Sequence, residues 1–392
     1  MAWQADATIA PSAPPQNKDT VLRRPRIALV QAGLGAGGTE KVMAQLATRL
    51  DRDGYVVTML AIHGTSDTAY HPLPAGVALR TMASELGESA ANRTLRRIAW
   101  LRRTLRGQDL ALSCLTKINV QTALATAGTD TRWIASERNN FRQQRMNPLW
   151  RAAMPLTLSR ADAVVMQTKA ARDALPGWAV RNARVVANPV ATAVLTTTKA
   201  PSSDLIAVGR LNDQKGYDVL LHALRIARDR GHRLPLTIYG VGKQEAKLKA
   251  LVQSLDLGCQ VRFAGRSDVP LGWTASPGIF VLSSRFEGFP NVLIEAMASG
   301  FAVLSTRCDW GPGEIITDGT DGMLVPVGDP AAMAEGLIRL QSSPALRHRL
   351  ANAAKSRAQD FDEAIIMGQW MQVIEDMLRE RSGAASGQPA PT

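Results

Sequence analysis

Two basic side chains share one short loop that follows a predicted buried strand. The strand is expected at residues 205–209, the loop carries Arg210 and Lys215, and a helix is expected to begin near Tyr217. In an alternating strand and helix fold, such a loop lies at the carboxyl edge of the sheet, where ligands bind. Arg can hold two phosphate oxygens, and Lys adds a point charge. The pair therefore predicts a site for a diphosphate that gains negative charge as it leaves. Two ordinary surface charges near a helix start are the alternative.

A second loop adds two carboxylates and an exposed helix start. It follows a predicted strand at residues 278–282 and carries Glu287 ahead of a helix expected to begin near Asn291, with Glu295 one turn inside. The first backbone N–H groups of that helix, at about Asn291 to Leu293, are free to hold phosphate oxygens. A carboxylate beside a diphosphate would repel it. We therefore predict that Glu287 and Glu295 accept hydrogen bonds from sugar and ribose hydroxyls. The alternative, acids favoured by the helix dipole, explains Glu295 but not Glu287.

The elements that must position these loops alternate between strand and helix in two series. Predicted strands lie at residues 26–32, 56–62, 110–115, 132–136, 163–167 and 184–187, and then at 205–209, 236–239, 261–264, 278–282, 302–305 and 323–326. This alternation predicts an α/β chain with two doubly wound Rossmann-like domains facing across a cleft. The expected divisions are a disordered tail (1–25), an N-terminal domain (26–190), a linker (191–203), a C-terminal domain (204–362), a helix returning toward the N-terminal domain (363–381) and a disordered tail (382–392).

Glu287 and Glu295 are separated by seven residues within the run EGFPNVLIEAMA. This run resembles the signature of family 4 retaining glycosyltransferases of the GT-B fold. Other stretches resemble the family in the same order along the chain. Residues 208–216 match its diphosphate clamp, residues 239–242 its donor-side glycine loop, and residues 262–266 the segment beside the base. Residues 311–326 resemble the end of that domain in members that assemble bacterial polysaccharides. The similarity covers nearly all of residues 26–380.

The resemblance implies a hexosyltransferase that uses no metal and no cofactor. It would move a hexose or N-acetylhexosamine from a nucleotide-diphosphate sugar to a lipid-linked or polysaccharide acceptor held by the N-terminal domain, in cell-surface polysaccharide biosynthesis. A UDP-sugar is favoured, and GDP-mannose is the alternative. Arg210 and Lys215 would bind the diphosphate, Glu287 the donor sugar and Glu295 the ribose. Replacing Glu287 or Lys215 by Ala is then predicted to abolish transfer and leave the fold intact. The remaining expected donor-binding residues are Gly37, Gly38, Gly240, Gly242, Arg266, Phe289, Pro290, Asn291, Val292 and Leu293.

Two motifs in the first domain point to other enzymes. Residues 33–38 satisfy GxGxxG after a strand and before a helix, the dinucleotide fingerprint of dehydrogenases. Such an enzyme needs an acid at the end of its second strand to bind ribose, and residues 60–64 contain none. In the resembled family, residues 37–40 would instead form a loop facing acceptor and donor phosphate, with a purely structural turn as the alternative. The DxD sequence at residues 51–53 is interpreted as a solvated turn, because it lies away from the ligand edge.

A polar segment, residues 136–140, follows a predicted strand and is expected to face the cleft. Many family members carry a histidine near this point, and this sequence has none there, since its five histidines are His63, His71, His222, His232 and His348. The identity of any catalytic or sugar-contacting histidine therefore stays open. The expected acceptor or cleft residues are Glu40, Glu137, Arg138 and Asn139.

The excess positive charge lies entirely in the first half. Residues 1–200 hold 26 Lys and Arg against 13 Asp and Glu, a net charge of +13, whereas residues 201–392 hold 20 against 21. A basic amphipathic helix at about 93–106 contributes to this excess, and a second cluster comprises Arg138, Arg142, Arg145 and Arg151. Both favour an anionic inner-membrane surface or a lipid-linked diphosphate as partner. An ordinary surface helix is the alternative. The expected membrane-binding residues are Arg93, Arg96, Arg97, Arg102 and Arg103.

Three dispersed cysteines, no apolar run of bilayer length and no signal peptide predict a cytoplasmic chain that is peripheral on the inner face of the plasma membrane. Two other functions stay open at this point. One is a sugar-nucleotide epimerase or phosphorylase of the same architecture. The other is a basic nucleic-acid-binding protein, suggested by a pI near 10.1. Because no binding module or interleaved aromatic residues accompany the charge, no nucleic-acid partner is expected.

Overall fold

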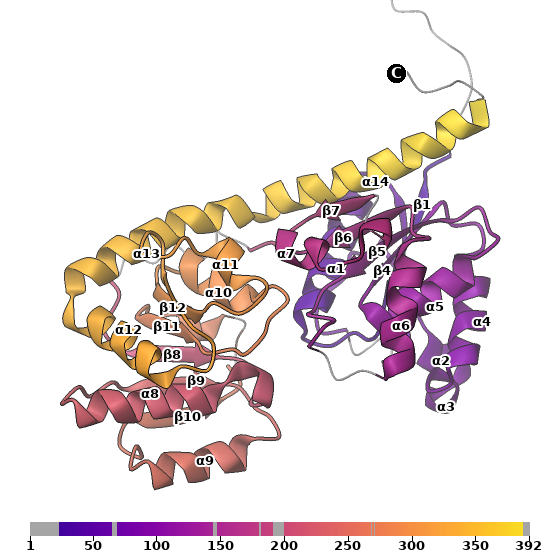
Figure 1. Cartoon of the computed structure of the whole chain (residues 1–392). Coiled ribbons are helices and arrows are strands. Elements are labelled where there is room, and N and C mark those ends of the chain that lie inside the picture. The colour runs from indigo at the N-terminus through magenta and orange to yellow at the C-terminus, as the bar shows by residue number, and fades with distance from the viewer. Residues whose placement is uncertain are drawn as a thin grey trace, which may run out of the picture.

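The computed structural model of the 392-residue chain describes residues 23–64, 69–143, 147–179, 182–190, 200–267, 269 and 271–386. Residues 1–22 of the expected N-terminal tail, 191–199 of the expected linker and 387–392 of the expected C-terminal tail lie outside this part, as does Arg145. Figure 1 shows two α/β halves side by side, with α13 (Pro344–Ala358) lying along the C-terminal half and the long α14 (Glu363–Ser386) continuing along the N-terminal half. The two doubly wound domains predicted from the alternation of strands and helices are confirmed.

The N-terminal half is built on a parallel seven-stranded sheet in the order β3-β2-β1-β4-β5-β6-β7. Its strands are buried on both faces, as a parallel sheet covered by helices requires, and Ile27, Ala28, Leu29 and Val30 of β1 are fully buried. The strands are β1 (Arg26–Gln31), β2 (Val56–Ala61), β3 (Ala78–Thr81), β4 (Leu110–Cys114), β5 (Arg132–Glu137), β6 (Ala163–Met166) and β7 (Ala183–Val185). The helices are α1 (Gly38–Arg52), α2 (Met82–Leu86), α3 (Glu88–Ala91), α4 (Thr94–Leu105), α5 (Thr116–Thr126), α6 (Pro148–Leu158) and α7 (Lys169–Asp173).

The C-terminal half has a parallel six-stranded sheet in the order β10-β9-β8-β11-β12-β13. Its strands are β8 (Leu205–Val208), β9 (Leu236–Tyr239), β10 (Val261–Gly265), β11 (Ile279–Leu282), β12 (Ala302–Thr306) and β13 (Met323–Val325). The helices are α8 (Tyr217–Asp229), α9 (Glu245–Ser254), α10 (Asn291–Ala298), α11 (Pro312–Ile315), α12 (Pro330–Ser342) and α13 (Pro344–Ala358). The strand order reverses between β8 and β11, and in open parallel sheets ligands bind outside the carboxyl ends of the strands at that reversal.

The final helix, α14 (Glu363–Ser386), returns to the N-terminal half. Its apolar side chains Ile366, Trp370 and Ile374 are buried in one cluster with Leu29 of β1 and Leu46 of α1. This agrees with the expected return of the C-terminal helix. The helix continues to Ser386, however, past the expected end at residue 381, so residues 382–386 were wrongly assigned to a disordered tail. Ala384 and Ala385 in that segment favour helix, whereas Gly383 disfavours it.

The chain crosses between the halves twice, and the two crossings bond to each other. The Val190 N–H donates to the Phe361 carbonyl at 2.8 Å, and the Glu363 N–H donates to the Val190 carbonyl at 3.1 Å. Val190, where the first crossing begins, is therefore joined to residues 361–363 of the second. Within the described residues, no helix combines the length and apolar character that a bilayer crossing needs.

Candidate active site

The two loops singled out by the sequence lie against each other at the carboxyl edge of the second sheet. Strands β8 and β11 are hydrogen-bonded neighbours, so the loops that follow them emerge side by side. The Arg285 N–H donates to the Gln214 carbonyl at 2.7 Å, and the Ser283 hydroxyl donates to the Lys215 carbonyl at 2.8 Å. Gly216 has φ +60°, and a Cβ at this position would lie 2.2 Å from the Ser283 carbonyl oxygen. Glycine is therefore required for this close approach of the two backbones.

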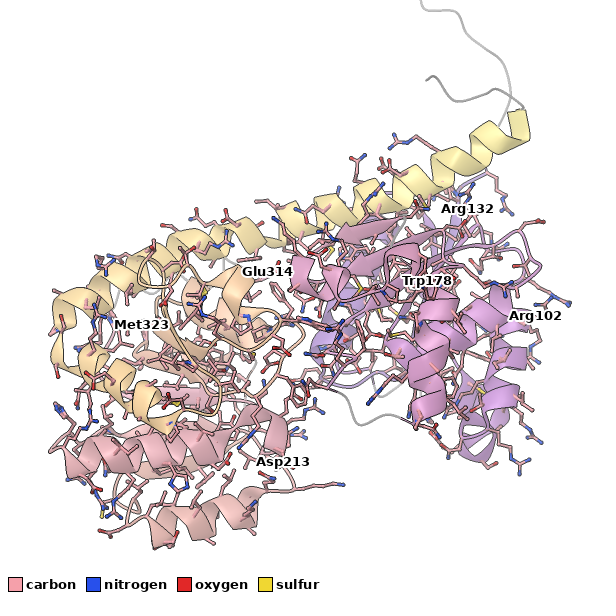
Figure 2. All side chains as sticks on the ribbon, viewed as in Figure 1. Arg102, Arg132, Trp178, Asp213, Glu314 and Met323 are labelled. Carbon is pink, nitrogen blue, oxygen red and sulfur yellow. The ribbon has the colours of Figure 1, made fainter. Side chains whose placement is uncertain are left out.

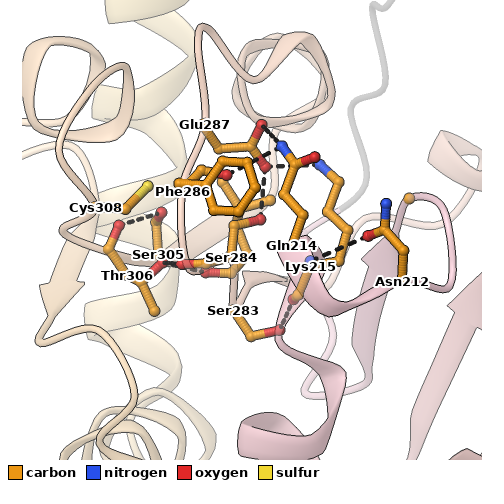
Figure 3. A network of polar contacts seen from close by, with 12 residues as sticks. Asn212, Gln214, Lys215, Ser283, Ser284, Phe286, Glu287, Ser305, Thr306 and Cys308 are labelled. Carbon is orange, nitrogen blue, oxygen red and sulfur yellow. Dashed lines mark hydrogen bonds and ion pairs between the residues drawn. The ribbon is translucent and has the colours of Figure 1, made fainter. Parts of the chain in front are cut away.

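Lys215 and Glu287 meet where these two loops touch (Figure 3). The Lys215 ammonium lies 2.7 Å from Glu287 Oε1, and the Ser284 hydroxyl donates to the same oxygen at 2.6 Å. Gln214 Nε2 lies 3.5 Å from Glu287 Oε2 and also donates to the Phe286 carbonyl at 3.1 Å. The carboxylate is thus held in one orientation by a cation and a hydroxyl.

The start of α10 supplies free backbone donors beside this pair. Its N-cap residue, Pro290, has no side chain that can accept a hydrogen bond, and the described residues provide no acceptor for the backbone N–H groups of Asn291 and Val292. The Leu293 N–H, in contrast, donates to the Pro290 carbonyl at 2.9 Å. The expectation of three free groups was therefore wrong by one, because the first turn tightens. Two N–H groups at a helix start still form an anion site of ordinary kind.

Two of the expected donor-binding side chains lie inside the C-terminal core. Phe289 is 8% exposed and stacks edge-on against Phe361, with ring centroids 5.7 Å apart, and Leu293 is fully buried. Neither side chain faces the cleft, because both are packed into the core beneath the loop and the helix start. Phe289 and Leu293 thus anchor the start of α10 in the C-terminal core.

The glycine loop after β9 positions Arg210. Gly240 has φ +149°, and a Cβ there would lie 1.9 Å from the Gly209 carbonyl oxygen, while a Cβ on Gly242 would lie 2.3 Å from the Leu211 carbonyl oxygen. Both glycines therefore allow the β9 loop to pack against the backbone on either side of Arg210. The Arg210 side chain itself is exposed, and so is that of Arg266 at the end of β10.

The N-terminal half brings the first turn of α1 to the same place. A Cβ on Gly38 would lie 2.7 Å from Asn291 Nδ2, so the starts of α1 and α10 nearly touch across the cleft. Lys41 Nζ, one turn further, lies 2.9 Å from Glu295 Oε1. Burial raises the pKa of the Glu40 carboxyl, while its own backbone hydrogen bond and the charge of Arg210 act in the opposite direction. Arg210 of one half is therefore near enough to Glu40 of the other for their charges to interact.

Two family models match the chain over adjoining stretches. The model described as Glycosyl transferase 4-like domain matches residues 37–191, and the model described as Glycosyl transferases group 1 matches residues 197–357. The chain belongs to the family 4 glycosyltransferases of the GT-B fold. This confirms the family that the Glu287 to Glu295 segment resembles.

Individual relatives agree with this family. The chain is 25% identical over 363 residues to the GalNAc-alpha-(1->4)-GalNAc-alpha-(1->3)-diNAcBac-PP-undecaprenol alpha-1,4-N-acetyl-D-galactosaminyltransferase of Campylobacter jejuni, covering 90% of this chain and 99% of the relative. It is 30% identical over 209 residues to the lipopolysaccharide core biosynthesis glycosyltransferase LpsE of Rhizobium meliloti, covering 50% and 59%. A crystal structure of HepE from Anabaena in complex with UDP superposes with a TM-score of 0.75 at 19% identity, covering 90% of this chain and 100% of that one.

The segment after β5 lies deeper in this glycosyltransferase than the sequence suggested. Glu137 is 2% exposed, and its carboxylate accepts from the Thr116 hydroxyl at 2.5 Å and from the Arg138 N–H at 3.1 Å. Burial raises the pKa of this carboxyl from 4.5 to about 7. The side chain therefore faces the interior between β5 and α5 and does not face the cleft as expected.

Arg138, expected to face the cleft, is buried and links the two halves through Asn188. Its guanidinium is buried, donates to the Asn188 side-chain oxygen, and lies over the Trp370 ring of α14 at 5.7 Å from the centroid. The Asn188 amide donates in turn to the Asn291 side-chain oxygen at the start of α10. Neighbouring Asn139 places its Cα where a Cβ on Gly288 would come within 2.8 Å. Arg138 and Asn139 thus line the junction of the halves, close to Gly288.

The loop at Trp310 and Glu314 fastens the halves together, a role that the sequence did not predict. Trp310, from the C-terminal half, is 5% exposed and packs with Phe141 of the N-terminal half, with ring centroids 4.9 Å apart. Glu314 of α11 accepts hydrogen bonds from the Lys169 and Ala170 N–H groups at 2.8 and 2.7 Å, at the start of α7 (Figure 2). A carboxylate of one half therefore caps a helix of the other. We call Trp310 and Glu314, with their partners, the clasp.

His71 is a second residue near the site that sequence reasoning missed. It lies in the connection between β2 and β3, close to the Gly37 backbone and to the charge of Lys41. Burial first, and then the Lys41 charge, lower the pKa of its imidazole, while a backbone hydrogen bond to Gly37 acts in the opposite direction. No motif surrounds this histidine, so only the fold reveals that it approaches the glycine loop.

Several arginines of the basic helix α4 are engaged by other groups of the chain, which the sequence did not predict. Arg102, on the outer helix layer in Figure 2, donates to the Ala127 carbonyl at 2.8 Å, and Arg97 donates to the Ala91 carbonyl. Arg103 pairs with Glu85 at 3.3 Å. Arg93 and Arg96 remain exposed, beside Leu95, which is 81% exposed. The expected membrane-binding set therefore divides, because carbonyls at the ends of α3 and α5 engage part of it.

The second basic cluster does not form one patch. Arg138 is buried at the junction of the halves, and Arg142 donates to the Ala174 carbonyl at 2.8 Å near α7. The position of the DxD sequence agrees with its interpretation as a turn away from the ligand edge. Asp53 is the C-cap of α1 and pairs with Arg49 at 2.6 Å, so the DxD sequence lies at the end of α1, before β2.

Proposed function

We propose that this glycosyltransferase moves a hexose or N-acetylhexosamine from a nucleotide-diphosphate sugar to a lipid-linked or polysaccharide acceptor, with retention of anomeric configuration. One observation carries the proposal. The Arg210–Lys215 loop, the free N–H groups of Asn291 and Val292, and Glu287 converge at the carboxyl edge of the second sheet. Positive charge and backbone donors are the groups that stabilise a departing diphosphate.

Each group has a distinct part in the proposed reaction. Arg210 and Lys215 would share the charge that develops on the leaving diphosphate, and the start of α10 would hold its oxygens. Glu287, already fixed by Ser284, would accept hydrogen bonds from the donor sugar, and Glu295 those from the ribose. Because the two cations can neutralise the leaving group, we propose that no metal and no other cofactor takes part. Activity is then expected to survive EDTA.

The acceptor class is proposed from the relatives. A C. jejuni relative of nearly the same length acts, by its name, on an undecaprenol-diphosphate-linked saccharide, and the R. meliloti relative acts in lipopolysaccharide core biosynthesis. We therefore propose a place in cell-surface polysaccharide biosynthesis, and a UDP-sugar as the favoured donor. GDP-mannose is the alternative donor.

The direct test of the donor is protection against thermal unfolding. UDP, GDP, ADP and their sugar derivatives are added singly to the full chain, and the shift in Tm is measured. A ligand that binds only the folded chain raises Tm, and the stabilisation grows with the logarithm of its concentration relative to Kd. UDP or a UDP-sugar is expected to give the largest shift, and Arg210→Met is expected to remove most of it. No shift with any nucleotide would contradict the proposal.

We also propose that the chain binds an anionic membrane surface through the outer helices of its N-terminal half. Arg93, Arg96 and Leu95 are exposed on α4, and Leu149 and Leu156 are 77% and 63% exposed on α6. Each cation near an anionic surface contributes about 1 kcal/mol. Sedimentation with phosphatidylglycerol vesicles should carry the wild type down, and Arg93→Glu with Arg96→Glu should reduce this. Equal sedimentation of both proteins would contradict the proposal.

A further inference from the structure

A lysine that no motif includes crosses from the N-terminal half to the donor site. Lys41 lies in the first turn of α1, and its ammonium is 2.9 Å from Oε1 of Glu295 on α10. The two residues are 254 positions apart in the chain. Glu295 is the carboxylate to which the proposed function gives the ribose, so this ion pair connects the acceptor half to a donor-binding group.

The Lys41–Glu295 ion pair is largely buried, which strengthens the attraction between its charges. The Lys41 side chain is 28% exposed and the Glu295 side chain is 10% exposed, so water screens their attraction much less than at the surface. Lys41 occupies one carboxylate oxygen, Oε1. The other, Oε2, has no hydrogen-bond partner among the described residues. The geometry thus fixes the carboxylate and leaves one acceptor oxygen for a hydroxyl group.

The pair also depends on the approach of the two halves. Gly38, three residues before Lys41, lies so close to Asn291 that a Cβ would come within 2.7 Å of its Nδ2. The clasp at Trp310 and Glu314 holds the same two halves together. If the halves separated, Lys41 would leave Glu295 as a carboxylate without its cation.

We infer that Lys41 is a positioning residue for the donor: it holds the Glu295 carboxylate in one orientation, so that recognition of the donor ribose requires the N-terminal half to be in place. The inference rests on the proposed function, because it takes Glu295 as the ribose acceptor. Its consequence is that donor affinity depends on a residue outside the domain that binds the donor. A direct contact between Lys41 and the diphosphate is the competing role, and the experiment below separates the two.

The test is a double-mutant cycle on nucleotide affinity. Isothermal titration calorimetry with UDP, and with GDP, is carried out on the full-length wild type, Lys41→Met, Glu295→Gln and the double variant. Lys41→Met is expected to weaken binding of the preferred nucleotide about tenfold, a coupling of ordinary size. The double variant should bind no more weakly than Glu295→Gln alone, because Lys41 acts through Glu295. Additive losses would assign Lys41 to the diphosphate and overturn the positioning role.

Two further variants serve as controls for this result. Lys41→Arg keeps the cation and should recover most of the affinity. Lys247→Met removes an exposed lysine from α9, away from the cleft, and should bind like the wild type. In transfer assays Lys41→Met should raise the donor KM more than it lowers kcat and leave the acceptor KM unchanged. If the wild type binds UDP or GDP and Lys41→Met binds equally well, the inference alone fails. If the wild type binds neither, the proposed function fails with it.

Discussion

The Lys215 ammonium and the Glu287 carboxylate form an ion pair of 2.7 Å in which the two side chains are only 14% and 7% exposed. A buried pair of this kind contributes little net stability, because desolvation offsets the attraction between the charges. Removing one partner is different, since the remaining charge stays buried without compensation. The sequence-based expectation that Lys215→Ala leaves the fold intact therefore needs revision.

Lys215→Met is predicted to lower the free energy of unfolding by about 3 to 5 kcal/mol, because Glu287 remains buried and unpaired. Urea unfolding followed by circular dichroism measures this loss. Adding Glu287→Gln to the same chain removes the stranded charge and should restore most of the stability. Both proteins should be inactive in sugar transfer. If the single and double variants were equally stable, the pair would not be buried in the way described.

Substitution of Arg210 is predicted to lower activity without lowering stability. Its side chain is exposed at the cleft edge of the β8 loop, so Arg210→Met should change the free energy of unfolding by less than about 0.5 kcal/mol. The same change should lower kcat by about 100-fold or more, because one donor to the developing charge is lost. Arg339→Met, at an exposed position on α12, is the matched control and should keep full activity. Full activity of Arg210→Met would remove Arg210 from the site.

Local patterns in the sequence were sufficient to predict the loops of the second half. Arg210, Lys215 and Glu287 each follow a buried strand, and parallel strands bring their carboxyl ends to one edge. Strand β3 was missed because its four residues, ALRT, form an edge strand with no apolar run. The identity of the residues at the start of α10 was predicted as well, but not that Phe289 and Leu293 turn into the core.

Local sequence patterns could not predict the contacts between the two halves. Lys41 and Glu295, or Trp310 and Phe141, meet only because the two halves are packed against each other. Nothing in the sequence around Glu137 distinguishes a buried carboxylate from one facing the cleft, since both follow a strand. Arg97 and Arg102 likewise look like surface charges until the ends of α3 and α5 are placed beside them.

Trp310 is predicted to hold the two halves together. Trp310→Ala removes a buried ring from the contact with Phe141 and should lower the free energy of unfolding by about 3 kcal/mol, as for other buried aromatic residues. Small-angle scattering should also show a larger radius of gyration, because the clasp loses its apolar part. Trp178→Ala removes a tryptophan that is 51% exposed and serves as the control, with little change expected in either measurement. Identical behaviour of the two variants would argue against the clasp.

Glu137 is predicted to make stability fall with rising pH. Burial raises the pKa of its carboxyl from 4.5 to about 7, so between these values the folded chain binds a proton that the unfolded chain releases. The stabilisation is complete below pH 4.5 and is lost as the pH rises through 7, a difference of about 3 kcal/mol for a shift of this size. Glu137→Gln resembles the protonated acid but does not titrate. Free energies of unfolding measured from pH 5 to 8 should therefore fall less steeply in this variant than in the wild type. The same substitution at exposed Glu335 should keep the wild-type slope, and a Glu137→Gln slope equal to that of the wild type would show that this carboxyl is already ionised in the fold at pH 5.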